Sequence, residues 1–250
     1  MYVKELIVLY NVRPVGILHV GAHLAEEDSE YRLNKYDNGG GVIWVEAIPK
    51  IAQEIKNRLD PQLNKVYCAA IWNQDGMELE FNLASQTASS SLLEFGLHKK
   101  SYPNISVTDK ILVITKRLDT LLAVEDSFEL VVLDIQGAED RAIESLGNRI
   151  DKVKYIFMEI SRKELYLGTR LVKEMDEYLN GLGFIRVFTA WDRRAKWGDA
   201  LYVRKEIYRQ SNSQKIKSKI RVFSRFIRQW VPLSFFPVLV KFKSFLRGKV

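Results

Sequence analysis

Residues 131–139 read Val131-Val132-Leu133-Asp134-Ile135-Gln136-Gly137-Ala138-Glu139, an apolar run that stops abruptly at an acid. Two earlier runs stop in a similar way, Ile17-Leu18-His19-Val20-Gly21-Ala22-His23 and Val42-Ile43-Trp44-Val45-Glu46-Ala47. A parallel α/β sheet presents its ligand groups in this manner, at the carboxyl ends of its strands. A glycine junction followed about 25 residues later by an acid is typical of an adenosine site, because glycine lets the chain approach the ligand and the acid accepts hydrogen bonds from ribose hydroxyls.

Around these junctions the chain alternates strand-like and helix-like patterns, as βαβ units do. Strands are expected at 16–21, 42–47, 66–71, 129–134, 153–160, 184–190 and 199–204. Helices are expected at about 24–37, 50–59, 138–149 and 170–182, with Pro49 opening the second and Gly181 ending the last. The pattern predicts an α/β fold with a doubly wound, mainly parallel, seven-stranded Rossmann-like sheet.

The stretch from Ala84 to Lys110 interrupts this alternation of strands and helices. It follows a turn at residues 73–76 and an alternating strand at 78–83, and it contains the small polar run Ser85-Gln86-Thr87-Ala88-Ser89-Ser90-Ser91. An insertion at this point would project from the strand ends towards the ligand face. Two interpretations stay open, a surface loop and a substrate lid.

Composition narrows the class of protein further. With 250 residues, 47% of them hydrophobic, the chain can bury a full core as one domain. The single cysteine, Cys68, excludes a disulfide framework and suits a reducing compartment. No Cys or His cluster has metal-site spacing, and the first residues lack the cationic region of a cleaved signal peptide. We therefore expect a cytoplasmic protein, and no residue is a candidate metal ligand.

The net charge of +7 hides a division between two parts of the chain. Residues 205–250 hold twelve Lys and Arg residues and one acid, a net charge of +11, whereas residues 1–204 hold 26 basic and 30 acidic residues, a net charge of −4. The expected domains are therefore a body at 1–204, with the insertion at about 84–110, and a basic tail at 205–250. The acidic body makes nucleic acid an unlikely partner.

The tail has an amphipathic helical pattern. Ile216, Ile220, Phe223, Ile227 and Trp230 recur at helical spacing, with Lys and Arg residues on the opposite side. Neither of its apolar pieces approaches the roughly 20 residues needed to span a bilayer. An anionic membrane surface bound through residues 214–249 is the leading interpretation, which would place the protein peripherally on the inner face of a membrane. Packing on a partner protein or on its own domain, and a basic arm for nucleic acid, remain alternatives.

At its strand ends the chain resembles the FkbM family of S-adenosylmethionine-dependent methyltransferases, within the Rossmann-like class. The resemblance covers about residues 15–204. The segments that carry it, in order, are Ile17 to His23, Trp44-Val45-Glu46-Ala47, Ser89-Ser90-Ser91-Leu92-Leu93, Leu133 to Glu139, and Trp197-Gly198-Asp199-Ala200-Leu201-Tyr202. The chain departs from the family at its first junction, where His19, His23 and Ala25 stand in place of an aspartate, an asparagine and a second glycine.

The resemblance implies S-adenosylmethionine as cofactor and assigns roles to particular residues. Glu46 would grip the ribose, Ala69 and Ala70 would lie near the adenine, and Glu26 or Asp134 would contact the cofactor's ammonium in place of residue 19. The full set of expected cofactor residues is Gly21, Ala22, His23, Glu26, Glu46, Ala47, Ala69, Ala70 and Asp134. Expected substrate-binding residues are Ser90, Ser91, Glu139 and Trp197.

Methyl transfer to a hydroxyl needs a base that accepts the hydroxyl proton. The catalytic candidates are Asp134, Glu159 and His98, since a carboxylate at an apolar strand end acquires a raised pKa. The alternative for Asp134, and for Glu139, is capping of the helix that follows. His19, on an apolar strand, is expected to be a packed core residue.

The resemblance favours an O-methyltransferase acting on a saccharide of a surface glycan or a glycosylated metabolite, with a saccharide or glycolipid acceptor as partner. Its closest rival is a non-catalytic domain that binds adenosine compounds and acts as a membrane-associated interaction protein. A nucleotide-dependent oxidoreductase or sugar-nucleotide enzyme is a further alternative, although the second and third glycines of the dinucleotide fingerprint are missing. An RNA methyltransferase is a lesser variant, which the acidic body argues against.

Overall fold

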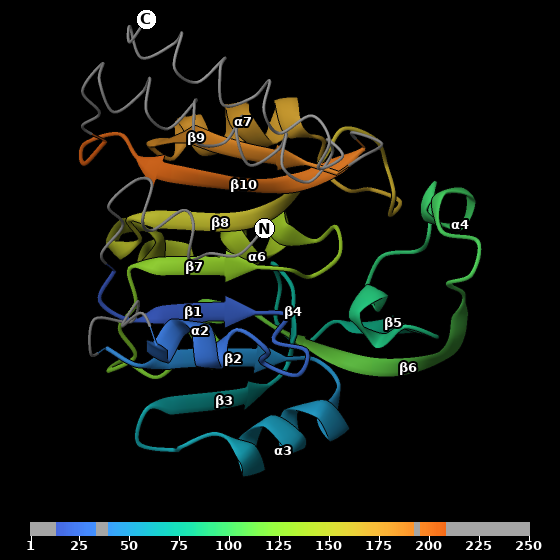
Figure 1. Ribbon diagram of the computed structural model, residues 1–250, viewed down its shortest axis with the longest axis horizontal. Coiled ribbons are helices and arrows are strands. Elements are labelled where there is room, and N and C mark those ends of the chain that lie inside the picture. The colour runs from blue at the N-terminus through green and yellow to red at the C-terminus, as the bar shows by residue number, and fades with distance from the viewer. Residues whose placement is uncertain (1–13, 34–39, 193–195, 209–250) are drawn as a thin grey trace, which may run out of the picture. The chain divides into compact units, whose positions relative to one another are not determined.

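The computed structural model describes residues 14–33, 40–192 and 196–208, and its centre is a seven-stranded sheet (Figure 1). The strand order is β3-β2-β1-β7-β8-β10-β9. The strands are β1 (Ile17–Val20), β2 (Val42–Glu46), β3 (Asn64–Cys68), β7 (Leu130–Leu133), β8 (Tyr155–Ser161), β9 (Phe184–Trp191) and β10 (Trp197–Arg204). Only β10 runs antiparallel to its neighbours β8 and β9. This confirms the mainly parallel Rossmann-like sheet.

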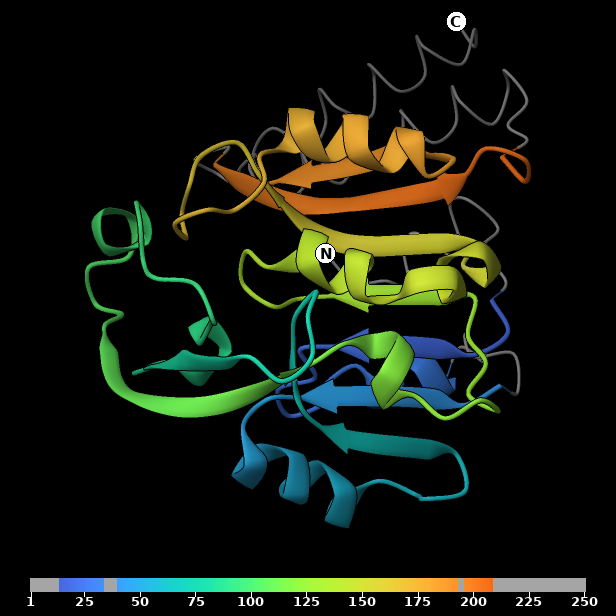
Figure 2. The same ribbon diagram turned by 180° about the vertical axis from the view of Figure 1, so that it is seen from behind.

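Helices lie on both faces of this sheet. The helix α2 (Asp28–Leu33) lies in front of β1 and β2 in Figure 1, and α6 (Glu139–Ser145) and α7 (Val172–Gly181) cover the opposite face, seen in Figure 2. Side chains alternate accordingly, because successive residues of a strand point to opposite faces. Leu18 is fully buried in the core cluster beneath α6 and α7, and each such buried side chain stabilises the fold by about 2 kcal/mol.

Several helix boundaries differ from those expected. The helix predicted at 24–37 begins only at Asp28, because His23 and Ala25 have φ angles of 43° and 49° and turn the chain before it. Its predicted end lies outside the described residues. The helix predicted at 138–149 is divided into α6 and the 3₁₀ helix η2 (Gly147–Lys152). The helix α3 (Pro49–Arg58) begins at the predicted proline, and a short α5 (Leu118–Leu121) precedes β7.

A second, three-stranded sheet lies beyond the carboxyl ends of β1, β2 and β7 (Figure 1). It has the order β4-β6-β5, formed by β4 (Ala70–Ile71), β5 (Glu78–Ala84) and β6 (Val107–Lys116). The prediction of one strand at 66–71 was therefore wrong, because the chain passes at Ala69 from the main sheet to the second one. The expected insertion at 84–110 contains the 3₁₀ helix η1 (Thr87–Ser89) and α4 (His98–Ser101) and ends within β6.

The basic tail expected at 205–250 lies outside the described residues from Arg209 onward, and so does its predicted amphipathic helix. Within the part of the chain that the structure describes, no helix combines the length and apolar character needed to cross a membrane.

Candidate functional site

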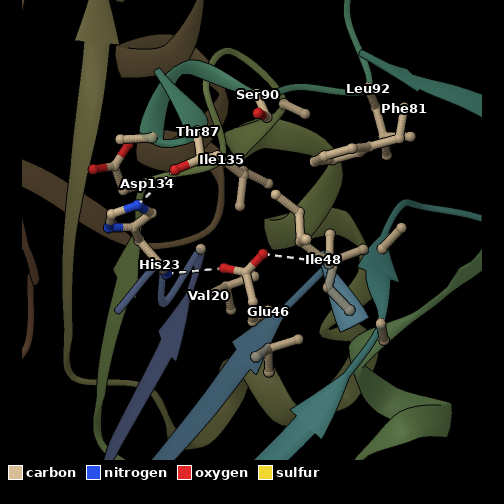
Figure 3. A pocket seen from close by; sticks show the side chains of 18 residues that line it. Val20, His23, Glu46, Ile48, Phe81, Thr87, Ser90, Leu92, Asp134 and Ile135 are labelled. Carbon is tan, nitrogen blue, oxygen red and sulfur yellow. Dashed lines mark hydrogen bonds between the residues drawn. The ribbon is translucent and has the colours of Figure 1, made fainter. Parts of the chain in front are cut away.

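A pocket opens at the carboxyl ends of β1, β2 and β7, where three apolar runs of the sequence stop (Figure 3). It holds about 670 Å³, including the space at its mouth. Its walls also include β4, Phe81 of β5 and residues between 87 and 92 of the insertion. Eight of the residues expected at the site line it: Gly21, His23, Glu46, Ala47, Ala69, Ala70, Ser90 and Asp134.

The turn after β1 is held by backbone geometry. Gly21 has a φ of 86°, and a Cβ atom built on it would lie 1.9 Å from the carbonyl oxygen of Asp134. The N–H groups of Gly21 and Ala22 both donate to the carbonyl oxygen of Val45, at 2.9 and 3.1 Å. Glycine is therefore required here by the close approach of β7, and the turn is fixed to β2.

His23 links this turn to the insertion. Its Nδ1 lies 2.9 Å from Glu26 Oε1, and its Nε2 lies 3.0 Å from Thr87 Oγ1 in η1. Glu26 is itself exposed and does not line the pocket. The Glu26 carboxylate therefore contacts His23, and its expected contact with the cofactor's ammonium stays a prediction.

Glu46 ends β2 with its carboxylate facing the pocket (Figure 3). Its Oε2 accepts the N–H of His23 and its Oε1 accepts the N–H of Ile48, both at 2.8 Å. Burial raises the pKa of Glu46, while these two hydrogen bonds act in the opposite direction. Each carboxylate oxygen keeps a further lone pair, so both can also accept hydrogen bonds from ligand hydroxyls.

The chemistry of this pocket fits an adenosine group without phosphates. Two carboxylates, Glu46 and Asp134, face it beside small and apolar side chains such as Ala69, Ala70 and Ile71. Its lining within the described residues includes no Lys or Arg, the side chains that bind phosphate groups most effectively. The residues present therefore suit a ribose and an adenine ring better than a dinucleotide.

Asp134 follows β7 at the boundary between this pocket and a second one. Its side chain is accessible to solvent in the cleft. The surrounding protein and the negative charge of Asp199 raise the pKa of Asp134 to about 6, while a 2.5 Å hydrogen bond from Gln136 Nε2 acts in the opposite direction. A carboxylate with a pKa near neutrality suits proton transfer. The helix-capping alternative is not what the structure has, because α6 begins after Ala138 without a side-chain cap.

Gln136 holds Asp134 through a chain of hydrogen bonds. Gln136 has a φ of 54°, which turns its side chain back to Asp134. The Tyr166 hydroxyl donates to Gln136 Oε1 at 2.5 Å and also lies 3.2 Å from the carbonyl oxygen of Ser89. The position of the Asp134 carboxylate is thus connected to η1 of the insertion.

The second pocket is larger, about 1480 Å³ with its open mouth. It shares Asp134 and Ala88 with the first pocket and extends over β8 and β10. Of the predicted catalytic and substrate residues, Glu159, His98 and Trp197 line it. Asp134 therefore lies between a cavity that fits adenosine and one with room for an acceptor.

Glu159 and Asp199 are cross-strand partners on β8 and β10 and both line the second pocket. Burial, followed by the negative charges of Asp134, Glu139 and Asp199, raises the pKa of Glu159 well above its usual value. Burial also raises the pKa of Asp199. Both carboxyl groups therefore hold a proton more readily than an exposed carboxyl group does.

His98 is 3% exposed and packs among the rings of Phe95, Tyr102 and Tyr166, whose centroids lie 4.2, 5.0 and 5.3 Å from its own. Its Nδ1 has no hydrogen-bond partner among the described residues. Burial lowers the pKa of His98, so the ring is neutral at neutral pH. His98 lines the second pocket, and its catalytic role stays a prediction.

Trp197 and its neighbour fasten β10 to the insertion. Trp197 Nε1 donates to the Tyr102 hydroxyl at 2.7 Å, and Lys196 Nζ donates to Ser101 Oγ at 2.8 Å. Because residues of the insertion line both pockets, it forms part of the site and is more than a surface loop.

Three other expected residues line neither pocket. Ala22 is buried in the turn after β1. Ser91 Oγ donates to the carbonyl oxygen of Gln136 at 2.9 Å. Glu139 Oε1 accepts the N–H groups of Ile135 and Gly137, each at 3.2 Å, and burial raises the pKa of Glu139 to about 7. These residues shape the loops around Asp134.

His19 is a packed core residue, as expected. It is 4% exposed, its ring stacks on Trp44 with 4.9 Å between centroids, and its Nδ1 lies 3.1 Å from the Tyr31 hydroxyl. Burial lowers the pKa of His19 to about 3, so it carries no charge. Its edge reaches the second pocket.

Sequence reasoning missed several residues of the two pockets. Thr87 lies within the insertion, and Glu27 directly follows Glu26, which was an expected cofactor residue. Both are therefore next to parts of the sequence that had been assigned to the site. Asp199 lies in the closing strand that carried the family resemblance. Tyr166 and Gln136 had no signal of their own, because the loops that bring them to the cavity are set by tertiary packing.

The described residues include no group of three or more His, Cys, Asp or Glu side chains arranged to hold a metal ion. The sequence was also compared with known proteins. Residues 19–186 match a family model described as a methyltransferase FkbM domain. No curated protein sequence matches the chain.

Several solved structures are similar to the chain at low sequence identity. A methyltransferase FkbM from Methylobacillus flagellatus KT is 13% identical with a TM-score of 0.47, over 75% of this chain and 43% of that one. A magnesium protoporphyrin IX methyltransferase from Synechocystis PCC 6803 with bound SAM is 13% identical with a TM-score of 0.44, over 81% and 76% of the two chains. A SAM-dependent methyltransferase from Aquifex aeolicus is 9% identical with a TM-score of 0.40, over 80% and 88%.

The family model matches more than half of the chain, from His19 in β1 to Arg186 in β9, and so includes every strand end that forms the first pocket. The chain spans less than half the length of the Methylobacillus protein. It belongs to the FkbM domain family of methyltransferases, and its methyl donor is S-adenosylmethionine.

Proposed function

We propose that this methyltransferase transfers the methyl group to a hydroxyl of a saccharide, in a surface glycan or a glycosylated metabolite. The observation that carries the proposal is the place of Asp134, which lines both the pocket that fits adenosine and the larger cavity beside it. The aromatic and carboxylate side chains of the larger cavity support a polyhydroxylated acceptor, because rings pack on sugar faces and carboxylates accept hydrogen bonds from hydroxyls.

Each side chain has a defined part in this reaction. Bound S-adenosylmethionine supplies an electrophilic methyl group on a positively charged sulfur. Glu46 would accept hydrogen bonds from the ribose hydroxyls. Asp134 would accept the proton of the acceptor hydroxyl as the new carbon–oxygen bond forms and the carbon–sulfur bond breaks. Glu159 and His98, which line the same cavity, are the other candidates for this base.

The test separates binding from transfer. S-adenosylhomocysteine should bind to the wild type and to Asp134→Asn in calorimetry, while Asp134→Asn should transfer methyl groups at least about 100-fold more slowly. Asp151→Asn, at an exposed position of η2, is the matched control and should behave as the wild type. Transfer by Asp134→Asn at the wild-type rate would exclude Asp134 as the base.

The acceptor is tested in cells. Mass spectrometry of surface glycans from cells with and without the gene should show the loss of one methyl mass in its absence. An unchanged glycan profile would exclude the glycan and leave a small glycosylated metabolite. If S-adenosylhomocysteine binds but no acceptor is methylated, the non-catalytic binding domain would replace the enzyme as the proposed function.

We also propose that residues 214–249 bind an anionic membrane surface, where a lipid-linked acceptor would be found. The support is the spacing of apolar and basic residues in the sequence of that segment. In a co-sedimentation assay with anionic vesicles, the full chain should bind and residues 1–208 should not. Equal binding of both would exclude the proposal.

A further inference from the structure

One wall of the larger cavity is formed by two chain segments that lie side by side. Residues 94–100, at the start of α4, lie beside residues 162–168, which follow β8 (Figure 1). The Leu97 N–H donates to the carbonyl oxygen of Glu164 at 2.9 Å. The residues of these segments that line the cavity are His98, Leu165 and Tyr166. We call the two segments the lip of the cavity, because their remaining residues are largely exposed on the outer surface.

The outer surface of the lip carries two large apolar side chains. Leu97 is 41% exposed and Leu167 is 48% exposed. Leu167 Cδ2 lies 3.0 Å from the point that a Cβ atom on Gly96 would occupy, so the Leu167 side chain covers the residue next to Leu97. Single exposed leucines are common on protein surfaces, but two neighbouring ones beside a ligand cavity form a candidate contact surface.

The same two segments carry an excess of positive charge. The lip holds four basic side chains and two acids, a net charge of +2, within a body at residues 1–204 whose net charge is −4. The basic residues, all of them exposed, are Lys99, Lys100, Arg162 and Lys163. Of the acids, Glu94 lies 4.0 Å from Lys110, and Glu164 accepts the N–H of Gly168 at 3.4 Å. Exposed leucines among cations suit an anionic bilayer, because the leucines can enter its acyl boundary while the cations contact its headgroups.

A second pair of exposed apolar side chains shows what distinguishes the lip. Leu112 and Ile114 of β6 are 67% and 55% exposed, more than the two leucines of the lip. Their cross-strand partners on β5 are Glu80 and Glu78, and of these Glu80 pairs with Lys110 at 2.6 Å. Leu112 and Ile114 line neither pocket. The lip therefore differs from this pair in its charge and in its place beside the cavity.

We infer that the lip contacts an anionic membrane surface, so that the larger cavity faces the bilayer and receives a saccharide carried on a lipid. This inference rests on the proposed function and adds to it an orientation of the catalytic body. The saccharide would enter the cavity and reach Asp134 while its lipid stays in the bilayer. Two leucines alone hold a protein weakly, so the lip orients the protein and the segment 214–249 supplies most of the affinity.

A fluorophore that responds to apolar surroundings tests the contact directly. Cys68→Ser removes the single native cysteine, and the label is then attached to Leu97→Cys in the full chain. With vesicles of phosphatidylglycerol and phosphatidylcholine, its emission should rise and shift to shorter wavelength, and vesicles of phosphatidylcholine alone should give a smaller change. The same label on Leu112→Cys is the matched control and should not respond. Leu167→Cys gives a second position in case Leu97→Cys does not fold.

A pair of charge reversals tests the cations of the lip. The full chain with both Lys99→Glu and Lys100→Glu should bind the anionic vesicles at least about tenfold more weakly in co-sedimentation, because each lysine near an anionic surface changes the affinity roughly fivefold. Lys50→Glu together with Lys56→Glu, both exposed on α3, changes the net charge equally and should bind nearly as the wild type. Equal losses in the two double variants would overturn the inference.

The remaining outcomes separate this inference from the proposals on which it rests. If the full chain sedimented with vesicles but the labels on the lip did not respond, the inference would be overturned and membrane binding by residues 214–249 would stand. If the full chain did not sediment, both would be overturned, and the proposed methyl transfer would be unaffected. A label that responded to soluble polyphosphate but not to vesicles would indicate a soluble polyanion as the partner and would also overturn the inference.

Discussion

The substitution Gly21→Ala tests how tightly the turn after β1 is packed against the end of β7. A Cβ atom at this position would lie 1.9 Å from the carbonyl oxygen of Asp134 and 3.1 Å from Ile135 Cγ2, and the residue would have to adopt a φ of 86°. The left-handed conformation costs an L residue about 1–2 kcal/mol. Forcing the two segments apart adds roughly 1–3 kcal/mol, as overpacking does elsewhere. We therefore expect a loss of about 2–5 kcal/mol in the free energy of unfolding.

The chain supplies a matched control for this experiment. Gly76 has a φ of 75°, close to that of Gly21, but a Cβ atom there would meet nothing within 4 Å. Gly76→Ala therefore carries the backbone cost without the collision and should lose only about 1–2 kcal/mol. The difference between the two variants isolates the contact with Asp134.

Urea unfolding gives the free energy of unfolding of each variant, provided that the slope of this free energy against urea concentration is unchanged. Gly21→Ala should be the less stable by about 1–3 kcal/mol, and its rate of methyl transfer should also fall, because the end of β7 that carries Asp134 must move. If both variants lost the same stability, the close approach of Gly21 to β7 would play no part, and the reasoning would be refuted.

Three further substitutions test the side chains around the site. Gln136→Ala removes the hydrogen-bond donor that lowers the pKa of Asp134, so this pKa should rise above about 6. The acidic limb of the profile of kcat/KM against pH should then move to higher pH. An unchanged limb would contradict the role given to Gln136. Glu46→Gln should weaken S-adenosylhomocysteine binding about tenfold in calorimetry by removing charge-assisted hydrogen bonds, whereas Glu54→Gln, exposed on α3, should bind normally. Burial raises the pKa of Glu139 to about 7 in the folded protein. The contribution of Glu139 to stability is therefore complete below the pKa that it has in the unfolded chain, and it is lost as the pH rises through 7. Glu139→Gln should remove up to about 3 kcal/mol of this dependence in urea unfolding between those two pKa values, and an unaltered dependence would contradict the assignment.

The central strands could be predicted from sequence because a strand buried on both faces is an uninterrupted apolar run. The runs ending at Gly21, Glu46 and Asp134 correspond to β1, β2 and β7. The same signal failed at 66–71, since an apolar run does not reveal that the chain changes sheets at Ala69. The strand β6 at 107–116 was missed because its partner, β5, lies about 30 residues away and leaves one of its faces exposed.

The start of α2 was misjudged for a different physical reason. The backbones of His23 and Ala25 adopt left-handed φ angles, and in a sequence such positions are normally occupied by glycine. The site was predictable to the extent that it consists of strand ends, since the carboxyl ends of parallel strands meet at one edge. The side chains of Tyr166 and Gln136 come from loops, and their meeting depends on how the insertion packs against the sheet.

The contact at Gly21 has a consequence for substitutions at Asp134. Gly21 lies against the main chain of Asp134, whereas the proposed proton transfer depends on the Asp134 side chain. Architecture and reactivity thus reside in different atoms of one residue. A substitution that replaces only this carboxylate should therefore change the reaction while leaving the turn after β1 and the sheet in place.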